Sequence, residues 1–363
     1  MLYYQKELDA IRRSGRFRKR TLFDENLIDL ASNDYLNLAS IPSLHQKASQ
    51  MLSSYAHHAP RASMLVNGYH PIHKNFEDAL KEANGFESAI IMGSGFNANI
   101  GLIESLVRKG DLLLIDEEYH ASGVAATDMC SGEVIFFAHN DEIELKKHLQ
   151  NSNHKRIIIA IEGVYSMGGD MVKREIIELA NEHNAIIIID EAHSSGVIGD
   201  RLLGVLDFYN ITPTPNIIKM GTLGKAYGSF GAYILCSSHI EDYLINRAKS
   251  IIYATAPSLY DSALGLCSFE YIQSNLKTLK AQIKQNQLII KEHLDIDIDA
   301  LIVPINIGSN SKVLELQSEL LEMGVIVGAI RAPTVKSAII RLIARVGIEP
   351  QQLIEISKRL RID

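Results

Sequence analysis

Short apolar runs alternate with stretches of helical periodicity between residues 86 and 236. The runs are ESAIIMG (87–93), DLLLID (111–116), EVIFFA (133–138), RIIIAIEG (156–163), AIIIIDEAH (185–193), NIIKMG (216–221) and GAYILC (231–236). Their nearly unbroken Ile, Leu and Val content is typical of strands that helices cover on both faces. Helical patterns over 96–110, 141–150 and 173–185 lie between them. The alternation predicts an α/β domain with a mostly parallel, seven-stranded sheet between helices.

The pattern changes after about residue 266 to that of a smaller α+β unit. Helical periodicity over 271–296, 312–324 and 350–361 surrounds apolar stretches at 301–308, 325–330 and 337–347. Residues 1–37 instead indicate an N-terminal arm with one helix, a basic run and a short strand within 26–35. A chain of 363 residues exceeds what one core usually serves. We therefore predict an arm (1–37), a large domain (38–265) and a small C-terminal domain (266–363).

Charge and composition exclude several classes of protein. The net charge is −7, and no apolar run reaches the roughly 18 residues of a membrane span. Neither a nucleic-acid nor a membrane partner is therefore expected, and the N-terminus resembles neither a secretory signal nor a transit peptide. Cys130, Cys236 and Cys267 are scattered and fit a reducing compartment. We expect a cytoplasmic protein without a disulfide or a metal site.

Polar side chains are concentrated where the predicted strands end. In open α/β sheets, ligands gather at the carboxyl ends of the strands. One polar group at such an end is common, but here five ends carry a lysine, acids, imidazoles and a glycine turn. The sequence therefore predicts a single site from Gly95, Phe96, His120, Glu162, Ser166, Asp190, His193, Thr222 and Lys225.

Lys225 is surrounded by Gly221, Gly224, Gly228 and Gly231. A lysine amine is a nucleophile only when deprotonated, and its pKa shifts readily when water is removed from it. Glycines let the backbone and a ligand approach the amine closely. This setting suits a Schiff base with a carbonyl compound, whereas the alternative is an ordinary solvated loop lysine.

Asp190 ends a fully apolar strand, so its charge needs a partner. The ring nitrogen of pyridoxal 5′-phosphate (PLP) is such a partner, because a carboxylate there keeps the ring protonated. The alternative is that Asp190 caps the helix that follows. His120 could stack on a flat cofactor and His193 could bond its phenolic oxygen, although packing roles are the alternative for both.

The turn SGFNAN opens a predicted helix and could bind the phosphate. The N–H groups of Gly95, Phe96 and Asn97 would face an anion at the helix N-terminus, and Thr222 could add a hydroxyl. By itself this turn is also compatible with an ordinary loop.

Ten segments resemble the α-oxoamine synthases, a family of fold type I PLP-dependent enzymes. They are LASNDYLNL (30–38), LVNGYHPIH (65–73), SGFNANIGLI (94–103), EYHAS (118–122), FFAHND (136–141), EGVYSMGGD (162–170), IDEAHSSGVIGD (189–200), GTLGKAYGSFGA (221–232), IIYATAPS (251–258) and AIRAPTV (329–335). Their order and spacing are those of the family. FFAHND and AIRAPTV resemble its oxononanoate synthase branch in particular.

The resemblance implies a role for each matching residue. Lys225, Asp190 and His120 would be catalytic, as the lysine that bonds to PLP, the partner of its ring nitrogen and the stacking ring. The cofactor would also contact Gly95, Phe96, Glu162, Ser166, His193 and Thr222. Thr255 resembles a phosphate ligand donated by the other subunit, which implies a homodimer with active sites at the subunit interface. Asn33 and Arg341 would hold the amino-acid carboxylate, and Arg18, in the basic run, would contact the acyl substrate.

The resemblance also implies an activity. An acyltransferase of this branch would condense L-alanine with pimeloyl-CoA or pimeloyl-acyl-carrier protein and release CO2 and the thiol. The product would be 8-amino-7-oxononanoate, a precursor of biotin. The alternatives are another family member, such as a 2-amino-3-ketobutyrate CoA ligase acting on glycine and acetyl-CoA, or a non-catalytic PLP-binding protein. A dinucleotide-binding protein is a third, but the glycine spacing of GSGFNANIG does not fit its fingerprint.

Overall fold

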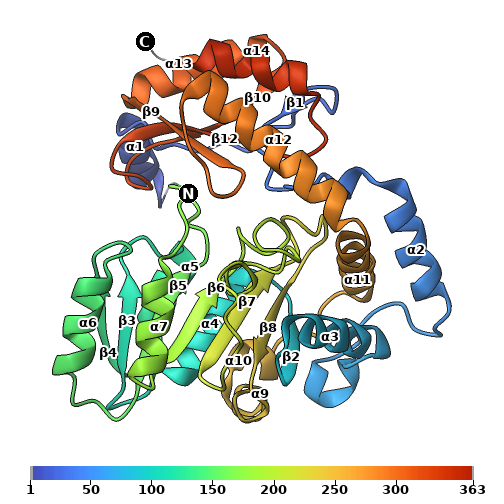
Figure 1. Cartoon of the computed structure of the whole chain (residues 1–363), viewed down its shortest axis with the longest axis vertical. Helices are drawn as coiled ribbons and strands as arrows, with labels where there is room; N and C mark the ends of the chain where they lie inside the picture. Colours follow the sequence, from blue (N-terminus) through green and yellow to red (C-terminus); the bar gives the residue numbers. More distant parts are fainter. Residues whose placement is uncertain (1–2, 362–363) are drawn as a thin grey trace.

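A seven-stranded sheet forms the centre of the larger part of the molecule (Figure 1). The computed structural model describes residues 3–361. The strands are β2 (Ser88–Met92), β3 (Leu112–Asp116), β4 (Glu133–Phe137), β5 (Ile157–Glu162), β6 (Ile186–Asp190), β7 (Ile217–Thr222) and β8 (Ala232–Cys236). Their order across the sheet is β2-β8-β7-β6-β5-β3-β4. Only β8 runs antiparallel to its neighbours, so the predicted mostly parallel sheet is confirmed.

Helices cover both faces of this sheet, which explains the continuous apolar strands. The helices of this part are α2 (Pro42–Ser53), α3 (Pro71–Asn84), α4 (Gly95–Leu106), α5 (Ala121–Thr127), α6 (Glu142–Asn151), α7 (Arg174–Glu182), α8 (Val205–Phe208), α9 (Ser238–Arg247), α10 (Lys249–Ile252) and α11 (Leu259–Ser274), with short turns η1 (Leu38–Ser40) and η2 (Met64–Gly68). Among them, α2 packs on α11 and not on the sheet. Every residue of β2, β3 and β8 is buried. Burial on two faces removes an alternating pattern and leaves the unbroken runs seen in the sequence.

A smaller unit packs above the carboxyl edge of the large sheet (Figure 1). It contains an antiparallel sheet of β9 (Ile302–Gly308), β12 (Ala338–Ile343) and β11 (Gly328–Ile330), with helices α12 (Leu276–Leu294), α13 (Asn310–Glu322) and α14 (Pro350–Leu360). The arm joins it through β1 (Ile28–Asp29), which pairs in parallel with β10 (Val325–Ile326). The predicted boundary at residue 265 falls within α11, and the division into domains stays a prediction.

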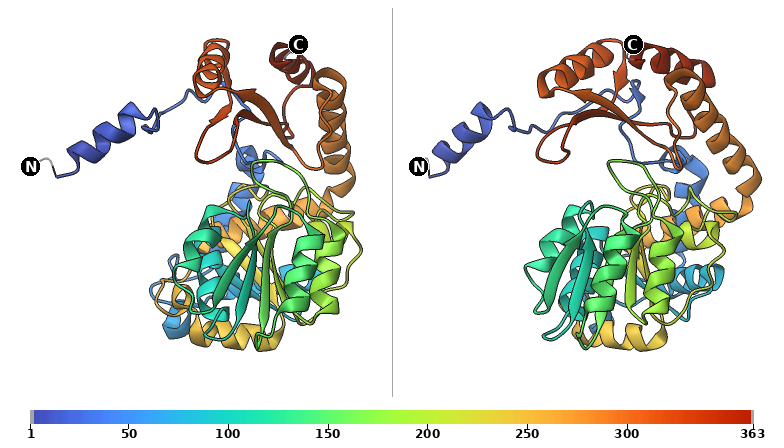
Figure 2. Two further views of the ribbon diagram at one scale, coloured as in Figure 1. Left: turned by 90° about the vertical axis from the view of Figure 1, so that its left-hand side faces the viewer. Right: turned by 60° about the vertical axis from the view of Figure 1, so that its left-hand side comes forward.

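The first helix, α1 (Gln5–Arg13), stands away from the body at the end of the arm (Figure 2). No residue of α1 is buried, although its apolar positions Leu8 and Ile11 recur on one face. The preceding Tyr3 and Tyr4 are about three-quarters exposed. The arm therefore presents apolar surface that this chain does not cover.

Two predicted elements are interrupted. The predicted helix over 271–296 is broken at Asn275, whose φ of −122° and ψ of 19° leave the helical region. The Asn275 side chain donates to the carbonyl of Tyr271, which is the competition with the backbone that makes asparagine a poor helix residue. The apolar stretch 325–330 is likewise divided at Val327, because β10 and β11 belong to different sheets.

Packing explains two of the glycines around Lys225. A Cβ on Gly221, in β7, would lie 2.3 Å from Cζ of Tyr233 in the neighbouring strand. Gly228 has a φ of +56°, and a Cβ there would lie 2.4 Å from the backbone nitrogen of Ala39. These residues let the segment that carries Lys225 lie directly against β8 and the start of the large domain.

We expect Gly221→Ala to destabilise the fold by about 1–3 kcal/mol, because the Tyr233 ring must move to admit a methyl group. Gly224→Ala is the matched control, since its Cβ would meet nothing closer than 3.7 Å. Thermal unfolding followed by circular dichroism would show a lower midpoint for the first variant only. Equal midpoints would contradict the packing explanation.

Candidate active site

A cavity of about 170 Å³ opens at the carboxyl edge of the large sheet. Eight of the predicted cofactor residues line it: Gly95, Phe96, His120, Glu162, Asp190, His193, Thr222 and Lys225. Four lining residues were not predicted: Asn99, Ser122, Ala192 and Met220. The parallel strands β5, β6 and β7 end side by side, so residues far apart in the sequence meet in one place.

The Lys225 amine lies inside this cavity beside His193. Nζ of Lys225 is 2.7 Å from Nε2 of His193. Burial and the nearby cations of Lys225 and Arg341 hold the pKa of His193 well below its usual range, so the ring is neutral and Nε2 accepts the bond. The other ring nitrogen, Nδ1, bonds the hydroxyl of Tyr35, which is buried.

Loss of water lowers the pKa of Lys225 to about 8, although the carboxyls of Asp190 and Glu162 act in the opposite direction. The amine therefore exchanges its proton close to neutral pH. An ordinary lysine, with a pKa near ~10.4, would be almost fully charged there. The site thus contains a nucleophile at a pH where cells operate.

Asp190 is fixed by two hydrogen bonds at the bottom of the cavity. Oδ2 accepts from Nδ2 of Asn99 at 2.9 Å, and Oδ1 accepts from the backbone N–H of Ala192 at 3.0 Å. Asn99 is itself oriented, because Tyr119 donates to its oxygen at 2.7 Å. Asn99 lies four residues after Gly95 on the same face of α4, and this spacing is the sequence signal that could have identified it.

His120 lies at the mouth of the cavity, where its Nδ1 is 2.7 Å from Oγ of Ser122. Ser122 also accepts from Nδ2 of Asn99 at 2.9 Å. A hydrogen-bonded series therefore connects the exposed imidazole to the buried Asp190 through two side chains that the sequence did not single out.

Glu162 lies beside Asp190 in the register of β5 and β6. Burial and the neighbouring Asp190 charge raise the pKa of Glu162 well above its usual range. Oε2 accepts from the backbone N–H of Ser166 at 3.0 Å. Within residues 3–361 no group bonds Oε1, which is also buried.

The N-terminus of α4 faces the cavity with Gly95 and Phe96. The expectation for Asn97 is wrong, because its N–H donates to the capping side chain of Ser94 at 3.2 Å. Oγ1 of Thr222 donates to the carbonyl of Gly231 at 3.0 Å. A Cβ placed on Gly95 would lie close to this oxygen.

Ser166 lies outside the cavity lining, and its carbonyl bonds Arg341 from the small unit. Nε of Arg341 donates to this carbonyl at 2.8 Å, and Nη1 donates to Oδ1 of Asn33 at 3.1 Å. The hydroxyl of Tyr35 also donates to Oδ1 of Asn33, at 3.5 Å. The structure thus brings Asn33 and Arg341 together and connects them through Tyr35 and His193 to Lys225.

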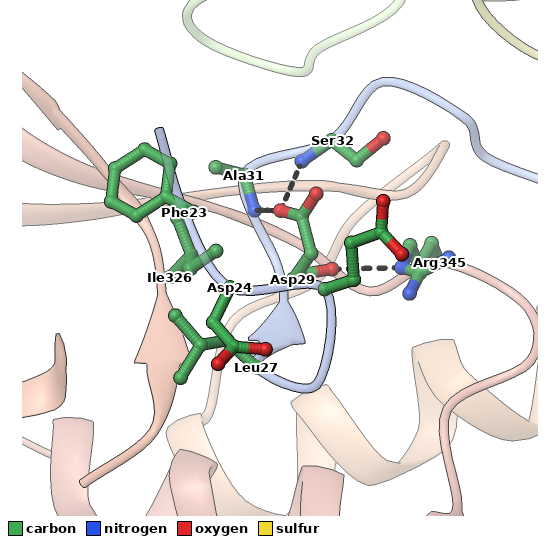
Figure 3. Close-up of a pocket in the computed structure, with 9 residues that line it drawn as sticks. Phe23, Asp24, Leu27, Asp29, Ala31, Ser32, Ile326 and Arg345 are labelled. Atoms are coloured by element: carbon green, nitrogen blue, oxygen red, sulfur yellow. Dashed lines mark hydrogen bonds between the residues drawn. The ribbon is translucent and has the colours of Figure 1, made fainter. Parts of the chain in front are cut away.

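Besides Ser166, Asn33 and Arg341, two further predicted residues lie outside the cavity lining in this chain. Thr255 lies exposed in the segment between α10 and α11, and Arg18 lies exposed in the arm. A separate hollow lies where the arm meets the small unit, between Phe23, Asp29 and Ile326 (Figure 3). Its polar groups are engaged locally: Asp29 accepts from the N–H groups of Ala31 and Ser32, and its carbonyl accepts from Arg345.

In the part of the chain that the structure describes, no cluster of His, Cys, Asp and Glu could hold a metal ion. No helix among those residues is long and apolar enough to cross a bilayer.

We expect the Lys225 amine of the cofactor-free protein to titrate with a midpoint near pH 8, because burial penalises its charge. Reductive methylation with ¹³C-formaldehyde and NMR across pH 6–11 would measure this midpoint. Asp190→Asn removes a nearby anion, so the midpoint should fall further. An unchanged or higher midpoint in that variant would contradict the assignment of charges.

Comparisons with known proteins show the family of the chain. Residues 25–360 match the family model of class I and II aminotransferases. The 8-amino-7-oxononanoate synthase of Helicobacter pylori (strain ATCC 700392 / 26695) is 45% identical over 341 residues, which cover 93% of this chain and 91% of that protein. The enzyme of the same name from Trichlorobacter lovleyi is 35% identical and covers 92% and 88%.

Solved structures share the fold. An 8-amino-7-oxononanoate synthase from Francisella tularensis is 26% identical, covers 93% of this chain and 98% of its own, and has a TM-score of 0.77. A serine palmitoyltransferase from S. paucimobilis, solved with bound PLP and myriocin, superposes with a TM-score of 0.90 at 21% identity over 98% and 95% of the two chains. The chain therefore belongs to the class I and II aminotransferase family of PLP-dependent enzymes, and within it to the α-oxoamine synthases related to 8-amino-7-oxononanoate synthase.

Proposed function

We propose that this protein condenses L-alanine with a pimeloyl thioester to give 8-amino-7-oxononanoate, CO2 and a free thiol, as a step in biotin synthesis. The observation that carries the proposal is the half-buried Lys225 amine, which has a lowered pKa and shares one cavity with Asp190. Relatives that bear the name of this activity, at up to 45% identity, support the choice of reaction.

The charged and hydrogen-bonding groups of the cavity fit PLP. Asp190, held by Asn99 and Ala192, would hold the protonated ring nitrogen. The start of α4 and Thr222 would hold the phosphate, because free N–H groups at a helix N-terminus attract anions. The unpartnered Oε1 of Glu162 marks a polar position that an entering ligand would satisfy. PLP, when bound, supplies an electron sink for the carbanion at the amino-acid α-carbon.

The residues of the chain supply orientation and proton transfer. The Lys225 amine would hold the cofactor at its carbonyl carbon, and as a free amine it would remove the α-proton of the amino acid and later return a proton. Neutral His193 keeps Nζ of Lys225 directed into the cavity. Tyr35 in turn holds the His193 ring in place. Asp190 is oriented by the hydrogen bonds that its two oxygens accept from Asn99 and Ala192.

Arg341 would bind the carboxylate of alanine. Its guanidinium is buried and uses Nε and Nη1 on Ser166 and Asn33, which leaves its remaining N–H groups for a ligand. Arg18 and the basic run of the arm would attract the acyl donor, whose distal carboxylate and phosphates are anionic. Under these assignments the amino acid would bind at Arg341 and the acyl donor near Arg18, so the two substrates would occupy different positions.

A homodimer would complete the site. Thr255 lies exposed and away from the cavity of its own chain, which fits a residue that contributes its hydroxyl to the phosphate of the partner subunit. The exposed apolar residues of the arm add surface that a second copy would cover.

We expect the purified protein to form 8-amino-7-oxononanoate from alanine and pimeloyl-CoA, identified by mass spectrometry. Parallel assays with glycine plus acetyl-CoA separate this activity from that of a 2-amino-3-ketobutyrate CoA ligase. Lys225→Ala should lose at least about a thousandfold in turnover, together with the visible absorbance of the lysine-bound cofactor. Lys280→Ala, a surface lysine paired with Asp200, is the control and should keep both. Turnover by Lys225→Ala would refute the role of this lysine.

A shared active site predicts complementation between two inactive variants. Lys225→Ala removes the nucleophile, and Thr255→Glu places a negative charge against the phosphate of the partner site. A mixed dimer contains one intact site, so co-expression with separate tags should restore about a quarter of the wild-type activity at random pairing. Activity no greater than the sum of the two variants would show that each chain builds its site alone.

A further inference from the structure

His139 forms an ion cluster that the proposed reaction does not use. It follows β4 and lies between Asp116, which ends β3, and Asp170, in the segment between β5 and α7. Its Nδ1 is 3.0 Å from Oδ1 of Asp116, and its Nε2 is 2.9 Å from Oδ2 of Asp170. Carboxylates accept hydrogen bonds, so both ring nitrogens carry a proton and the ring is an imidazolium.

The surroundings keep this charge in place. Burial by itself lowers the pKa of His139, but the hydrogen bonds and charges of Asp116 and Asp170 outweigh it and raise the pKa to about 10. Glu118 adds a third carboxylate at 3.9 Å, and the ring of Tyr165 packs edge-on with its centroid 4.3 Å away. The imidazolium therefore persists across the physiological pH range.

The cluster holds one end of the segment 163–172. Tyr165 donates to Oδ2 of Asp116 at 2.8 Å, next to the bond from His139. Asn140, the neighbour of His139, donates to the carbonyl of Met171 at 3.0 Å and accepts from the N–H of Lys173 at 2.9 Å. His139 and Asn140 thus connect the ends of β3 and β4 to a segment that has little regular structure of its own.

The same segment holds Arg341. Ser166 lies four residues before Asp170, and its carbonyl accepts from Nε of Arg341 while its N–H donates to Glu162. A displacement of the segment would move both the carbonyl that orients the guanidinium and the donor that satisfies Glu162. The guanidinium of Arg341 also bonds the side chain of Asn33.

We propose that His139 is a positioning residue: its imidazolium, bonded to Asp116 and Asp170, fixes segment 163–172 and so aims Arg341 at the substrate carboxylate. The local fixation of the segment does not depend on the identity of the substrate. The last step, the binding of a carboxylate, rests on the proposed function.

The first measurement is hydrogen–deuterium exchange in the full-length protein without added cofactor. His139→Gln cannot bond both carboxylates as a cation, so exchange in peptides covering 163–172 should become about tenfold faster. His154→Gln is the matched control, because His154 also bonds a carboxylate, Glu133, at 3.0 Å, but near the amino end of β4. Unchanged exchange in 163–172, or equal acceleration throughout the sheet, would overturn the proposal.

The second measurement separates aiming from general damage in the PLP-loaded enzyme. His139→Gln should raise KM for L-alanine about tenfold and leave kcat and KM for the acyl donor within about twofold, because only the carboxylate contact is misplaced. Asp170→Asn should act in the same direction. The double variant should be no worse than the more affected single variant, since both remove one linkage. A loss of kcat with unchanged KM for alanine, or additive effects, would overturn the proposal.

Together the two measurements distinguish an error in the proposed function from an error in the positioning role. If the wild-type enzyme does not use alanine but His139→Gln loosens 163–172 selectively, the proposed function is wrong and the positioning role is supported. If alanine is the substrate and neither exchange nor KM responds, the proposed function is supported and the positioning role is overturned.

Discussion

The whole site depends on one constraint: a lysine amine is kept out of water at the end of a parallel sheet. Burial of Lys225 works against its charge, and Asp190 and Glu162 work in favour of it. Because burial outweighs these charges and lowers the pKa of the amine to about 8, the amine can lose its proton without leaving its place. The rest of the structure maintains that burial, since helices seal the sheet on both faces and the glycines bring the segment against β8.

The two carboxyls in this cavity, those of Asp190 and Glu162, have different hydrogen-bonding surroundings. Asp190 accepts a hydrogen bond on each of its two oxygens, whereas Glu162 lies beside it with one oxygen unbonded among the described residues. Burial, together with the repulsion between two adjacent anions, raises the pKa of Glu162 well above its usual range. Asn99 is central to this arrangement because its amide nitrogen donates hydrogen bonds to both Asp190 and Ser122.

Much of this could be predicted from the sequence, and the exceptions have physical reasons. Continuous apolar strands predicted the sheet, and polar residues at strand ends predicted most of the cavity lining. The break at Asn275 was missed because helical periodicity continues through it, while a single side chain competes for the backbone. Asn99 and Tyr35 were missed because their roles depend on which side chain faces them, and periodicity carries no information on such pairings. Thr255 and Arg18 lie outside the cavity of one chain, so their roles stay predictions.

Asn33 and Arg341 are separated by 308 residues, yet they share a hydrogen bond that leads through Tyr35 and His193 to Lys225. During vectorial synthesis on the ribosome, the large sheet can assemble as soon as β8 has emerged. The proposed carboxylate pocket cannot close until β12, the last strand among the described residues, has joined residues made at the beginning. Contacts of such long range form late in folding. The nascent chain therefore places Lys225 in the sheet well before it joins Asn33 to Arg341, the pair proposed to select the substrate.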